Sequence, residues 1–419
     1  MNIVIILDQA HINGGQAKVA LDSALGLKRR GYTPIVFAAS GPVMPELATA
    51  GIEVVCLDQP EFVQDPDKKA AALRGLWNRQ AEKALDALLA RLPRGQTVIH
   101  LHGYAKSLSA SIAPPIARSG HPALYTMHEY YMLCPNGGFY NYRKHAHCTL
   151  KPLSAACWAT HCDTRNFGYK LWRGARGVIA NKVAHIPQTL TDIAYFHGYQ
   201  RSIIAPHLPA TTRLHEVANP IEADDLGPKA NPASGDFVFV GRLSTEKGCP
   251  LFAEAAAKAG ITPAFVGDGP AAEELKQRFP NAKFHGWQNV AGVRKALREA
   301  RCLVFPSLWH EGQPLTVLES LAMGTPVVAG DGSAGRESVV DGETGLWFKQ
   351  ANVDDLAAKL TLMTDDARVS AMSHAAYQRY WANPFTVDRH LNRLEEVYGV
   401  LLARAGTGLA GAGLAAARG

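Results

Sequence analysis

The sequence predicts an α/β fold with two doubly wound parallel sheets, one in each half of the chain. At 419 residues the chain is too long for one ordinary hydrophobic core, and two domains of about 200 residues each are expected. Short apolar runs alternate with longer helical patterns throughout, which is typical of parallel sheets whose strands are joined by helices. A turn-rich segment from Asn219 to Gly235 divides this alternation into two halves.

The two halves set the expected domain boundaries, 1–215 and 216–383. A segment 384–404 that contains a helix over 387–404 follows, and the tail 405–419 is almost entirely Ala, Gly and Leu, for which we expect disorder. In the first domain the expected strands are 3–7, 33–37, 97–101, 123–126 and 177–180, with a helix over 17–30. In the second domain they are 237–241, 263–267, 283–285 and 302–305.

Composition and charge narrow the class of protein. Apolar content of 47% and charged content of 19% are typical of a globular enzyme, and no apolar run reaches the roughly 20 residues that a membrane span needs. The N-terminus, MNIVIIL, predicts a first strand rather than a signal peptide, so we expect a cytoplasmic protein.

Charge is unevenly divided between the two halves. Residues 1–215 carry 23 Lys and Arg against 13 Asp and Glu, whereas the remainder carries 20 against 24. A basic N-terminal half suggests an anionic partner, such as the inner face of the cytoplasmic membrane or a lipid-phosphate acceptor. A basic face kept for solubility is the alternative. Because no nucleic-acid motif is present, we expect no nucleic-acid partner.

Glu311 and Glu319 lie in the most informative stretch, HEGQPLTVLESLAMGTPVVAG (310–330). A short apolar strand precedes Glu311 and an apolar helix contains Glu319, so Glu311 is placed on the loop where open α/β sheets bind ligands. The start of a helix offers unpaired N–H groups to an anion. The arrangement suits a phosphate-bearing ligand with hydroxyls on either side, such as a nucleotide sugar. Two solvated acids beside an ordinary helix start are the alternative.

This stretch resembles the motif of retaining glycosyltransferases of the GT-B fold, in the large glycosyl transferases group 1 family. In that family the two glutamates are also eight positions apart and a Gly-Thr-Pro-Val-Val segment follows, as at 324–328 here. The resemblance extends over the chain but is dense only from about 237 to 348. It implies two Rossmann-like domains facing across a cleft, with a last helix that crosses back to the N-terminal domain.

The resemblance also implies roles for the residues of this motif. Glu319 would accept hydrogen bonds from the ribose hydroxyls, and Glu311 would hold a hydroxyl of the donor sugar near the reacting carbon. In that family, retention of configuration is explained without a protein nucleophile, because the acceptor attacks the face of the sugar from which the leaving group departs. Glu311 is therefore not assigned as a nucleophile. Backbone amides would cradle the sugar and the distal phosphate. The expected donor-binding residues are Gly14, Gly15, Gly241, Gly269, Gly312, Gln313, Pro314, Leu315, Thr316 and Glu319.

Two cations and one glycine loop complete the expected donor site. Arg242 and Lys247 follow the first strand of the second half, and fixed cations stabilise a leaving diphosphate without a metal ion. Exposed side chains that pair with Glu246 are the alternative. Gly14 and Gly15 follow the first strand of the chain and would let a ligand approach a helix start, although a tight turn explains them equally. The pattern is not Gly-x-Gly-x-x-Gly, which disfavours nicotinamide dinucleotides.

The acceptor side is predicted from the segment TMHEYYMLCPNGG (126–138), which resembles the His-Asp-Tyr segment of the same family. His128 would lie in the cleft and orient the acceptor or help to accept its proton. A histidine that caps the strand end is the alternative. His102 is a weaker candidate for the same place.

Four cysteines fall between 134 and 162, at spacings of 14, 9 and 5 residues. Thiols stay reduced in the cytoplasm, so either a structural zinc site or small buried thiols would account for them. Tetrahedral zinc takes four Cys or His ligands, but these spacings match no standard zinc module. The candidate ligands are Cys134, Cys148, Cys157 and Cys162.

The resemblance therefore implies a retaining, metal-independent hexosyltransferase that needs no cofactor. It would use a nucleotide diphosphate sugar and act on a saccharide or lipid-linked saccharide in cell-surface polysaccharide or lipopolysaccharide assembly. Two alternatives stay open, a nucleotide-sugar 2-epimerase of the GT-B fold and a non-catalytic nucleotide-sugar binder. Product analysis without acceptor distinguishes the first, because an epimer would accumulate.

Overall fold

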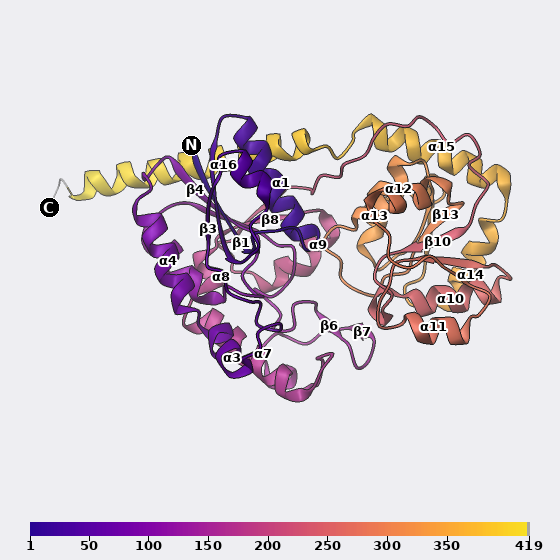
Figure 1. Ribbon diagram of the computed structural model, residues 1–419, viewed down its shortest axis with the longest axis horizontal. Coiled ribbons are helices and arrows are strands. Elements are labelled where there is room, and N and C mark those ends of the chain that lie inside the picture. The colour runs from indigo at the N-terminus through magenta and orange to yellow at the C-terminus, as the bar shows by residue number, and fades with distance from the viewer. Residues whose placement is uncertain (417–419) are drawn as a thin grey trace.

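The computed structural model describes the backbone of residues 1–416 and the side chains of residues 1–406. Two α/β units lie side by side (Figure 1), each built around one parallel sheet. The predicted fold class, two doubly wound sheets in the GT-B arrangement, is confirmed. None of the helices in this described part of the chain combines the length and apolar character that a membrane span requires.

The N-terminal sheet has seven strands in the order β3-β2-β1-β4-β5-β8-β9, all parallel. The strand order reverses between β1 and β4, and a doubly wound sheet binds ligands at such a switch point. The strands are β1 (Asn2–Gln9), β2 (Thr33–Ser40), β3 (Glu53–Cys56), β4 (Thr97–Leu101), β5 (Ala123–Thr126), β8 (Asp192–Tyr195) and β9 (Arg213–Glu216). The helices are α1 (Gly15–Arg29), α2 (Pro45–Thr49), α3 (Lys68–Leu76), α4 (Arg79–Ala90), α5 (Ala113–Ser119), α6 (Ala155–Ala159), α7 (Phe167–Lys182), α8 (Ile186–Thr189) and α9 (Gly198–Ile204).

The C-terminal sheet has six parallel strands in the order β12-β11-β10-β13-β14-β15, so its switch point lies between β10 and β13. The strands are β10 (Phe237–Val240), β11 (Pro263–Val266), β12 (Lys283–Phe284), β13 (Cys302–Phe305), β14 (Val327–Gly330) and β15 (Gly345–Phe348). The helices are α10 (Cys249–Lys258), α11 (Ala272–Arg278), α12 (Val290–Glu299), α13 (Leu315–Ala322), α14 (Val353–Leu362) and α15 (Asp366–Ala382).

Each sheet is buried on both faces, as the apolar strand sequences require. In β1, Val4 and Ile6 pack into one core of the N-terminal unit. Ile3, Ile5 and Leu7 point to the other core, because successive side chains of a strand alternate between faces. The strands therefore hold the residues that follow them in fixed positions at the ends of the sheets.

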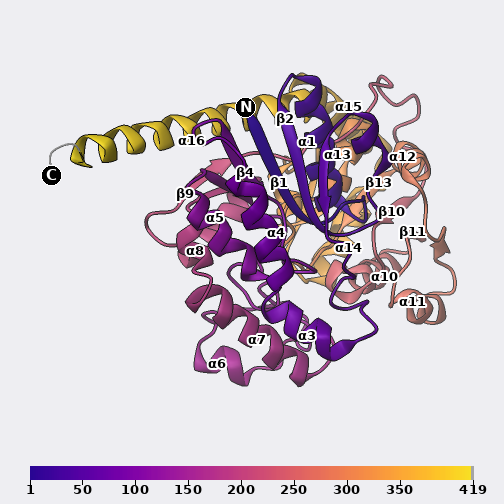
Figure 2. The same ribbon diagram turned by 60° about the vertical axis from the view of Figure 1, so that its left-hand side comes forward.

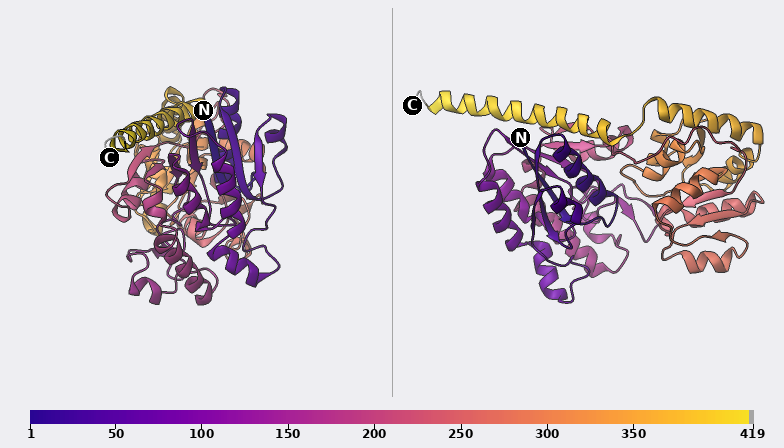
Figure 3. Two further views of the ribbon diagram at one scale, coloured as in Figure 1. Left: turned by 90° about the vertical axis from the view of Figure 1, so that its left-hand side faces the viewer. Right: turned by 45° about the horizontal axis from the view of Figure 1, so that its top comes forward.

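The last helix, α16 (Val387–Ala416), returns to the N-terminal unit, the crossing that the family resemblance implies. It lies along the N-terminal unit in the right-hand view of Figure 3. Leu391, Leu394, Val397 and Leu401 pack into the core on the β1 face. Tyr398 is fully buried beside them and its hydroxyl lies 2.6 Å from Nδ1 of His100 on β4. The N-terminal core is therefore completed by residues from the end of the chain.

The structure differs from the expected elements in the second half of the N-terminal unit. Residues 177–180, expected to form a strand, lie inside α7, whose first turn is capped by the side chain of Asn166. A short apolar run does not distinguish a strand from a buried helix segment. The strand in the sheet is β8, which pairs with β9, so the boundary expected at 215 falls within β9.

In the tail, the described residues 405–416 also differ from the expectation of disorder. The structure continues α16 to Ala416, and residues 417–419 lie outside the described part of the chain. Ala and Leu are strong helix formers, and each Gly in a helix costs only about 1 kcal/mol relative to Ala. These residues can therefore extend a helix that has already begun.

Candidate functional site

A cavity of about 440 Å³ lies between the two units, beside the switch points of both sheets. Its walls come from the loops after β1 and β5 on one side and after β10 and β13 on the other. The residues that line it are Gln9, Asn13, Gly14, Gly15, Gln16, Lys106, His128, Glu129, Tyr142, Phe196, Asn219, Arg242, Glu246, Lys247, Trp309, Glu311, Gly312, Gln313 and Leu315.

Lys247 and Glu311 form an ion pair in this cavity. The Lys247 Nζ atom lies 2.6 Å from Oε1 of Glu311, and the Ser307 hydroxyl donates to the same oxygen at 2.9 Å. Both ionic side chains are largely buried, with 30% and 15% of their surface exposed. The pair joins the loop after β10 to the loop after β13. It places a cation and a carboxylate where a phosphate and a sugar hydroxyl would compete for them.

Arg242 lies in the same cavity but is held differently. Its guanidinium pairs with Glu246, which also accepts a hydrogen bond from the Ser244 hydroxyl at 2.7 Å. The pKa of Glu246 is lowered although burial alone would raise it, because the Ser244 and Arg242 side chains donate to the charged form. Arg242 itself is 62% exposed. The predicted alternative, pairing with Glu246, therefore holds for Arg242 and not for Lys247.

Two helix starts also face the cavity. Gly14 caps α1 without a side-chain hydrogen bond, and Pro314 does the same for α13. Neither helix has an acidic residue in its first turn. A Cβ atom added to Gly15 would lie 3.9 Å from Cδ1 of Leu315, so the two helix starts approach each other across the domain boundary. Both positive dipole ends therefore act on the same space.

His128 lines the N-terminal side of the cavity. Its Nε2 atom lies 3.0 Å from Nδ1 of His102, and its ring packs against that of Phe196 with centroids 5.4 Å apart. The pKa of His128 is lowered to about 3, mainly by burial and to a smaller extent by nearby His390 and Lys106. The imidazole is therefore neutral near pH 7, which suits hydrogen bonding better than proton uptake.

Glu319 lies in the middle of α13, behind the cavity wall rather than on it. Burial raises its pKa to about 7, opposed by the charges of Arg294 on α12 and Lys18 on α1. No hydrogen bond to its carboxyl group is found among the described residues. A half-buried carboxyl group with cations from two helices nearby is a strong acceptor for a ligand that reaches it.

Four more of the predicted donor-binding residues do not line the cavity, namely Gly241, Gly269, Pro314 and Thr316. Gly269 packs against the backbone of Leu243, since an added Cβ would lie 2.4 Å from the Leu243 carbonyl oxygen. Gly241 donates its N–H to the carbonyl of Val266. These two glycines thus allow the loops after β10 and β11 to approach closely.

Several lining residues were not predicted from the sequence. Gln9 ends β1 and Lys106 lies in the loop after β4, and Tyr142 and Trp309 meet across the cavity with ring centroids 5.4 Å apart. Tyr142 follows the short strand β6 (Tyr140–Asn141), which pairs with β7 (Ala146–His147) and reaches towards the C-terminal unit (Figure 1). No local sequence pattern marks these residues, because they are brought together only by the domain arrangement.

The four cysteines between 134 and 162 give no sign of a metal centre. In the part of the chain with described side chains, no group of three or more His, Cys, Asp or Glu residues is arranged to hold a metal ion. Cys134, Cys157 and Cys162 are buried free thiols, and the Lys170 Nζ atom lies 3.4 Å from Sγ of Cys157. Of the two explanations, a structural zinc site or small buried thiols, the structure supports the buried thiols.

Comparisons with known proteins agree with this architecture. Residues 234–366 match the family model described as glycosyl transferases group 1. A GDP-mannose-dependent alpha-mannosyltransferase of Mycolicibacterium smegmatis is 32% identical over 178 residues, covering 41% of this chain and 45% of that protein. A sulfoquinovosyl transferase of Arabidopsis thaliana is 32% identical over 187 residues, covering 40% of this chain and 36% of that protein. The chain thus spans less than half the length of these relatives.

Solved structures match over nearly the whole chain. Anabaena HepE in complex with UDP superposes with a TM-score of 0.64 at 16% identity, covering 96% of this chain and all of that one. A sucrose-phosphate synthase of Thermosynechococcus elongatus gives a TM-score of 0.66 at 16% identity, covering 96% and 99%. At such identities the likeness describes the fold. Residues 234–366 are therefore similar in sequence to the glycosyl transferases group 1 family, and the chain as a whole has the GT-B fold.

Proposed function

We propose that the chain is a retaining, metal-independent glycosyltransferase that moves a hexosyl group from a nucleotide diphosphate sugar to a saccharide or lipid-linked saccharide. The observation that carries the proposal is the convergence of Arg242, Lys247 and the starts of α1 and α13 on one cavity. This convergence offers positive potential from both units to a diphosphate. A departing nucleoside diphosphate gains negative charge, and fixed donors stabilise it without reorganising.

The donor would lie against the C-terminal unit. Lys247 and Arg242 would contact the diphosphate, and the amides at the start of α13 would hold the distal phosphate and the sugar. Glu311 would exchange its bond to Lys247 for a sugar hydroxyl, and Glu319 would accept from the ribose. Support comes from the 2.6 Å pairing of Lys247 with Glu311, which already places both groups at one point.

The acceptor would enter from the N-terminal side, next to His128. With a pKa lowered to about 3 by burial, the ring is neutral and would orient an acceptor hydroxyl rather than take up its proton. The proton would then pass to the leaving phosphate, on the same face of the sugar. In the donor complex Glu311 would be engaged by a sugar hydroxyl and by the Ser307 hydroxyl, so a role as nucleophile is disfavoured and retention would follow from same-face attack.

The named relatives support a role in building cell-surface saccharides such as polysaccharide or lipopolysaccharide. They include a putative teichuronic acid biosynthesis glycosyltransferase of Bacillus subtilis, 35% identical over 133 residues. Their donors differ, since one is named for GDP-mannose and one solved structure holds UDP. The work would take place in the cytoplasm, at the inner face of the membrane if the acceptor is lipid-linked.

The first experiment is calorimetric titration of UDP, GDP and ADP into wild type and Glu319→Ala. One nucleotide should bind clearly better than the others and should bind more weakly to the variant. If none of the three nucleotides binds measurably, the proposed donor site is wrong. Incubating the preferred nucleotide sugar without acceptor then separates a transferase, which hydrolyses it slowly, from an epimerase.

Donor binding should depend on pH through Glu319. Burial raises the pKa of this carboxyl group to about 7, and ribose hydroxyls donate to its ionised form. The ionised fraction rises roughly tenfold between pH 6 and pH 8, so the nucleotide Kd should fall by up to about that factor. The Glu319→Gln variant keeps the nucleotide's own phosphate titration but lacks this carboxyl. An unchanged pH profile in the variant would disprove the assignment.

Turnover should also persist in excess EDTA. Lys247 and Arg242 supply the positive charge that a divalent cation supplies in other enzymes that transfer groups from nucleoside diphosphates. The measurement is product formation with and without chelator, with magnesium restored afterwards. Activity that disappears with EDTA and returns with magnesium would contradict metal independence.

A further inference from the structure

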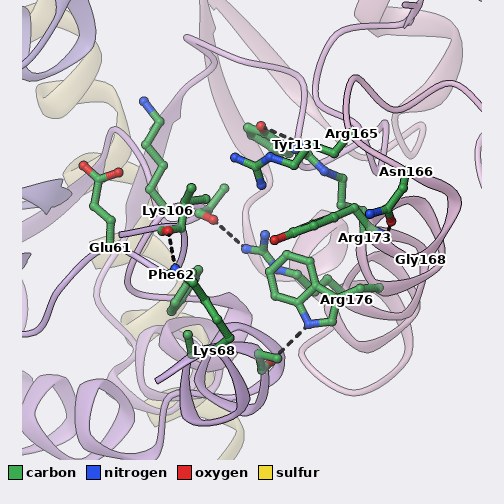
Figure 4. Close-up of a pocket in the computed structure, with 16 residues that line it drawn as sticks. Glu61, Phe62, Lys68, Lys106, Tyr131, Arg165, Asn166, Gly168, Arg173 and Arg176 are labelled. Atoms are coloured by element: carbon green, nitrogen blue, oxygen red, sulfur yellow. Dashed lines mark hydrogen bonds between the residues drawn. The ribbon is translucent and has the colours of Figure 1, made fainter. Parts of the chain in front are cut away.

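A second cavity, of about 360 Å³, opens on the N-terminal unit between α3, α7 and the loop after β4. These helices lie together on the lower side of the unit in Figure 2, away from the C-terminal sheet. The close-up in Figure 4 shows Lys106 and Glu61 on one side of the cavity, with Arg165 and Arg173 on the other. The lining residues are Glu61, Phe62, Val63, Lys68, Ala71, Ala72, Ala105, Lys106, Tyr131, Arg165, Asn166, Gly168, Tyr169, Trp172, Arg173 and Arg176.

Positive charge dominates this lining. Five lining residues are Lys or Arg, and Glu61 is the one acidic residue. Arg173 is already neutralised by an ion pair with buried Asp163 at 2.8 Å. Arg176 instead donates to the carbonyls of Gly75 and Ala105, at 3.0 and 2.7 Å, and forms no ion pair with a carboxylate in the described part of the chain.

Arg176 is therefore a desolvated cation that lacks a counter-ion. Burial lowers its pKa below the usual value for arginine, which shows that the surroundings disfavour the charged form. A buried charge is tolerated when it is paired and hydrogen-bonded. Carbonyl oxygens accept from the Nε and Nη2 atoms of Arg176 but supply only partial charge, so an anionic group entering the cavity would complete its environment.

Aromatic rings form the rest of the lining. The Arg176 guanidinium carbon lies 4.8 Å from the Trp172 ring centroid and 5.4 Å from that of Phe62. Arg165 lies 4.7 Å over the ring of Tyr169. Binding sites for small molecules are mostly apolar with a few placed polar groups. This mixture suits a ligand that has both a C–H face and a negative charge.

The cavity is joined to the candidate active site. Lys106 lines both cavities. Glu61 accepts hydrogen bonds at its Oε1 atom from Gln9 at 2.7 Å and from Asn13 at 3.3 Å, and both donors line the cavity between the units. Tyr131 follows His128 by three residues and lines the second cavity. A chain-like ligand with one end at His128 can therefore extend past Lys106 into this pocket.

We propose that this second cavity holds an acidic sugar residue of the acceptor, a pyranose ring that bears a carboxylate or phosphate. The ring would lie against Trp172 and Tyr169, and its anionic group would pair with Arg176 and Arg165. This inference rests on the proposed glycosyl transfer, since it names the acceptor of that reaction. A bounded pocket with its cation held inside fits one residue of a saccharide better than it fits the flat surface of a membrane.

The test measures the binding of three probes, glucuronic acid, glucose 6-phosphate and glucose. Ligand-observed NMR, without any nucleotide present, gives the Kd of each. At least one acidic probe should bind with a Kd at least tenfold below that of glucose. Arg176→Gln should raise that Kd at least tenfold. Because Arg176 also holds two carbonyls, Arg165→Gln provides a second variant, for which a threefold or larger rise is expected. Arg165 is exposed and its side chain takes part in no ion pair among the described residues.

Arg79→Gln is the matched control, because Arg79 is exposed on α4 and lines neither cavity. Equal binding of glucose and both acidic probes would overturn the proposal, and so would unchanged binding in Arg165→Gln together with Arg176→Gln. Binding to phosphatidylglycerol vesicles that depends on these arginines, without saccharide binding, would instead identify a membrane contact and overturn it. Nucleotide titration of the same proteins reports separately on the proposed function, because neither arginine lines the donor cavity.

Discussion

Replacing Lys247 by alanine is expected to lower turnover roughly 100-fold, the scale on which one charge-stabilising group acts in an enzyme. Lys247 is the cation that joins the loops after β10 and β13, through its 2.6 Å contact with Glu311. Its removal takes away charge stabilisation of the leaving diphosphate and also frees the carboxylate that would hold the sugar. The measurement is steady-state turnover at saturating donor, with the donor Kd determined in parallel.

Lys258→Ala is the control for this experiment. Lys258 forms an exposed ion pair with Asp354 on the same unit, outside the cavity, and exposed pairs contribute only about 0–1 kcal/mol. Its turnover should equal that of wild type. A Lys247→Ala protein with near wild-type turnover would remove Lys247 from the chemistry. A loss explained wholly by a weaker donor Kd would restrict its role to binding.

Leu394→Ala is expected to lower the free energy of unfolding by about 2–5 kcal/mol, the usual cost of truncating a fully buried leucine. Leu394 is 0% exposed and packs in the core that α16 shares with β1 and α1. Urea unfolding measures the effect, and the transition that shifts should be that of the N-terminal unit, although Leu394 lies near the end of the sequence.

Val400→Ala tests whether the effect is specific to the buried face of the helix. Val400 belongs to α16 as well, but it is 49% exposed, so its truncation should change stability by about 0.5 kcal/mol or less. Equal losses in the two variants would contradict the view that α16 is held by packing of its buried face on the N-terminal core, because alanine itself favours the helix.

Most strands were predictable because their burial shows in the sequence. Runs such as IVIIL in β1 and FVFV in β10 are apolar on both faces, which is what a covered parallel sheet requires. The run at 177–180 looked the same but belongs to α7, whereas β8 contains Asp192 and β9 contains charged residues at both ends. Whether these segments form strands depends on their pairing with strands distant in the sequence, and such pairing leaves no local sequence pattern.

The candidate site was predictable where one loop holds several of its residues. Glu311, Gly312 and Gln313 line the cavity as the motif implies. The ion pair of Lys247 with Glu311 rather than Glu246 was not predictable, because it joins two loops that meet only at the switch point of the sheet. The half-buried position of Glu319 was not predictable either, since it depends on how α12 and α1 approach α13.

The return of α16 has a consequence for how this protein is made. A ribosome releases the N-terminal unit first, but one face of its core stays open until Leu391 to Leu401 have emerged. The C-terminal sheet and its helices are contiguous in sequence, from Phe237 to Ala382, and can finish folding earlier. We therefore expect the second half of the nascent chain to mature before the first, which stays exposed to chaperones until α16 has emerged.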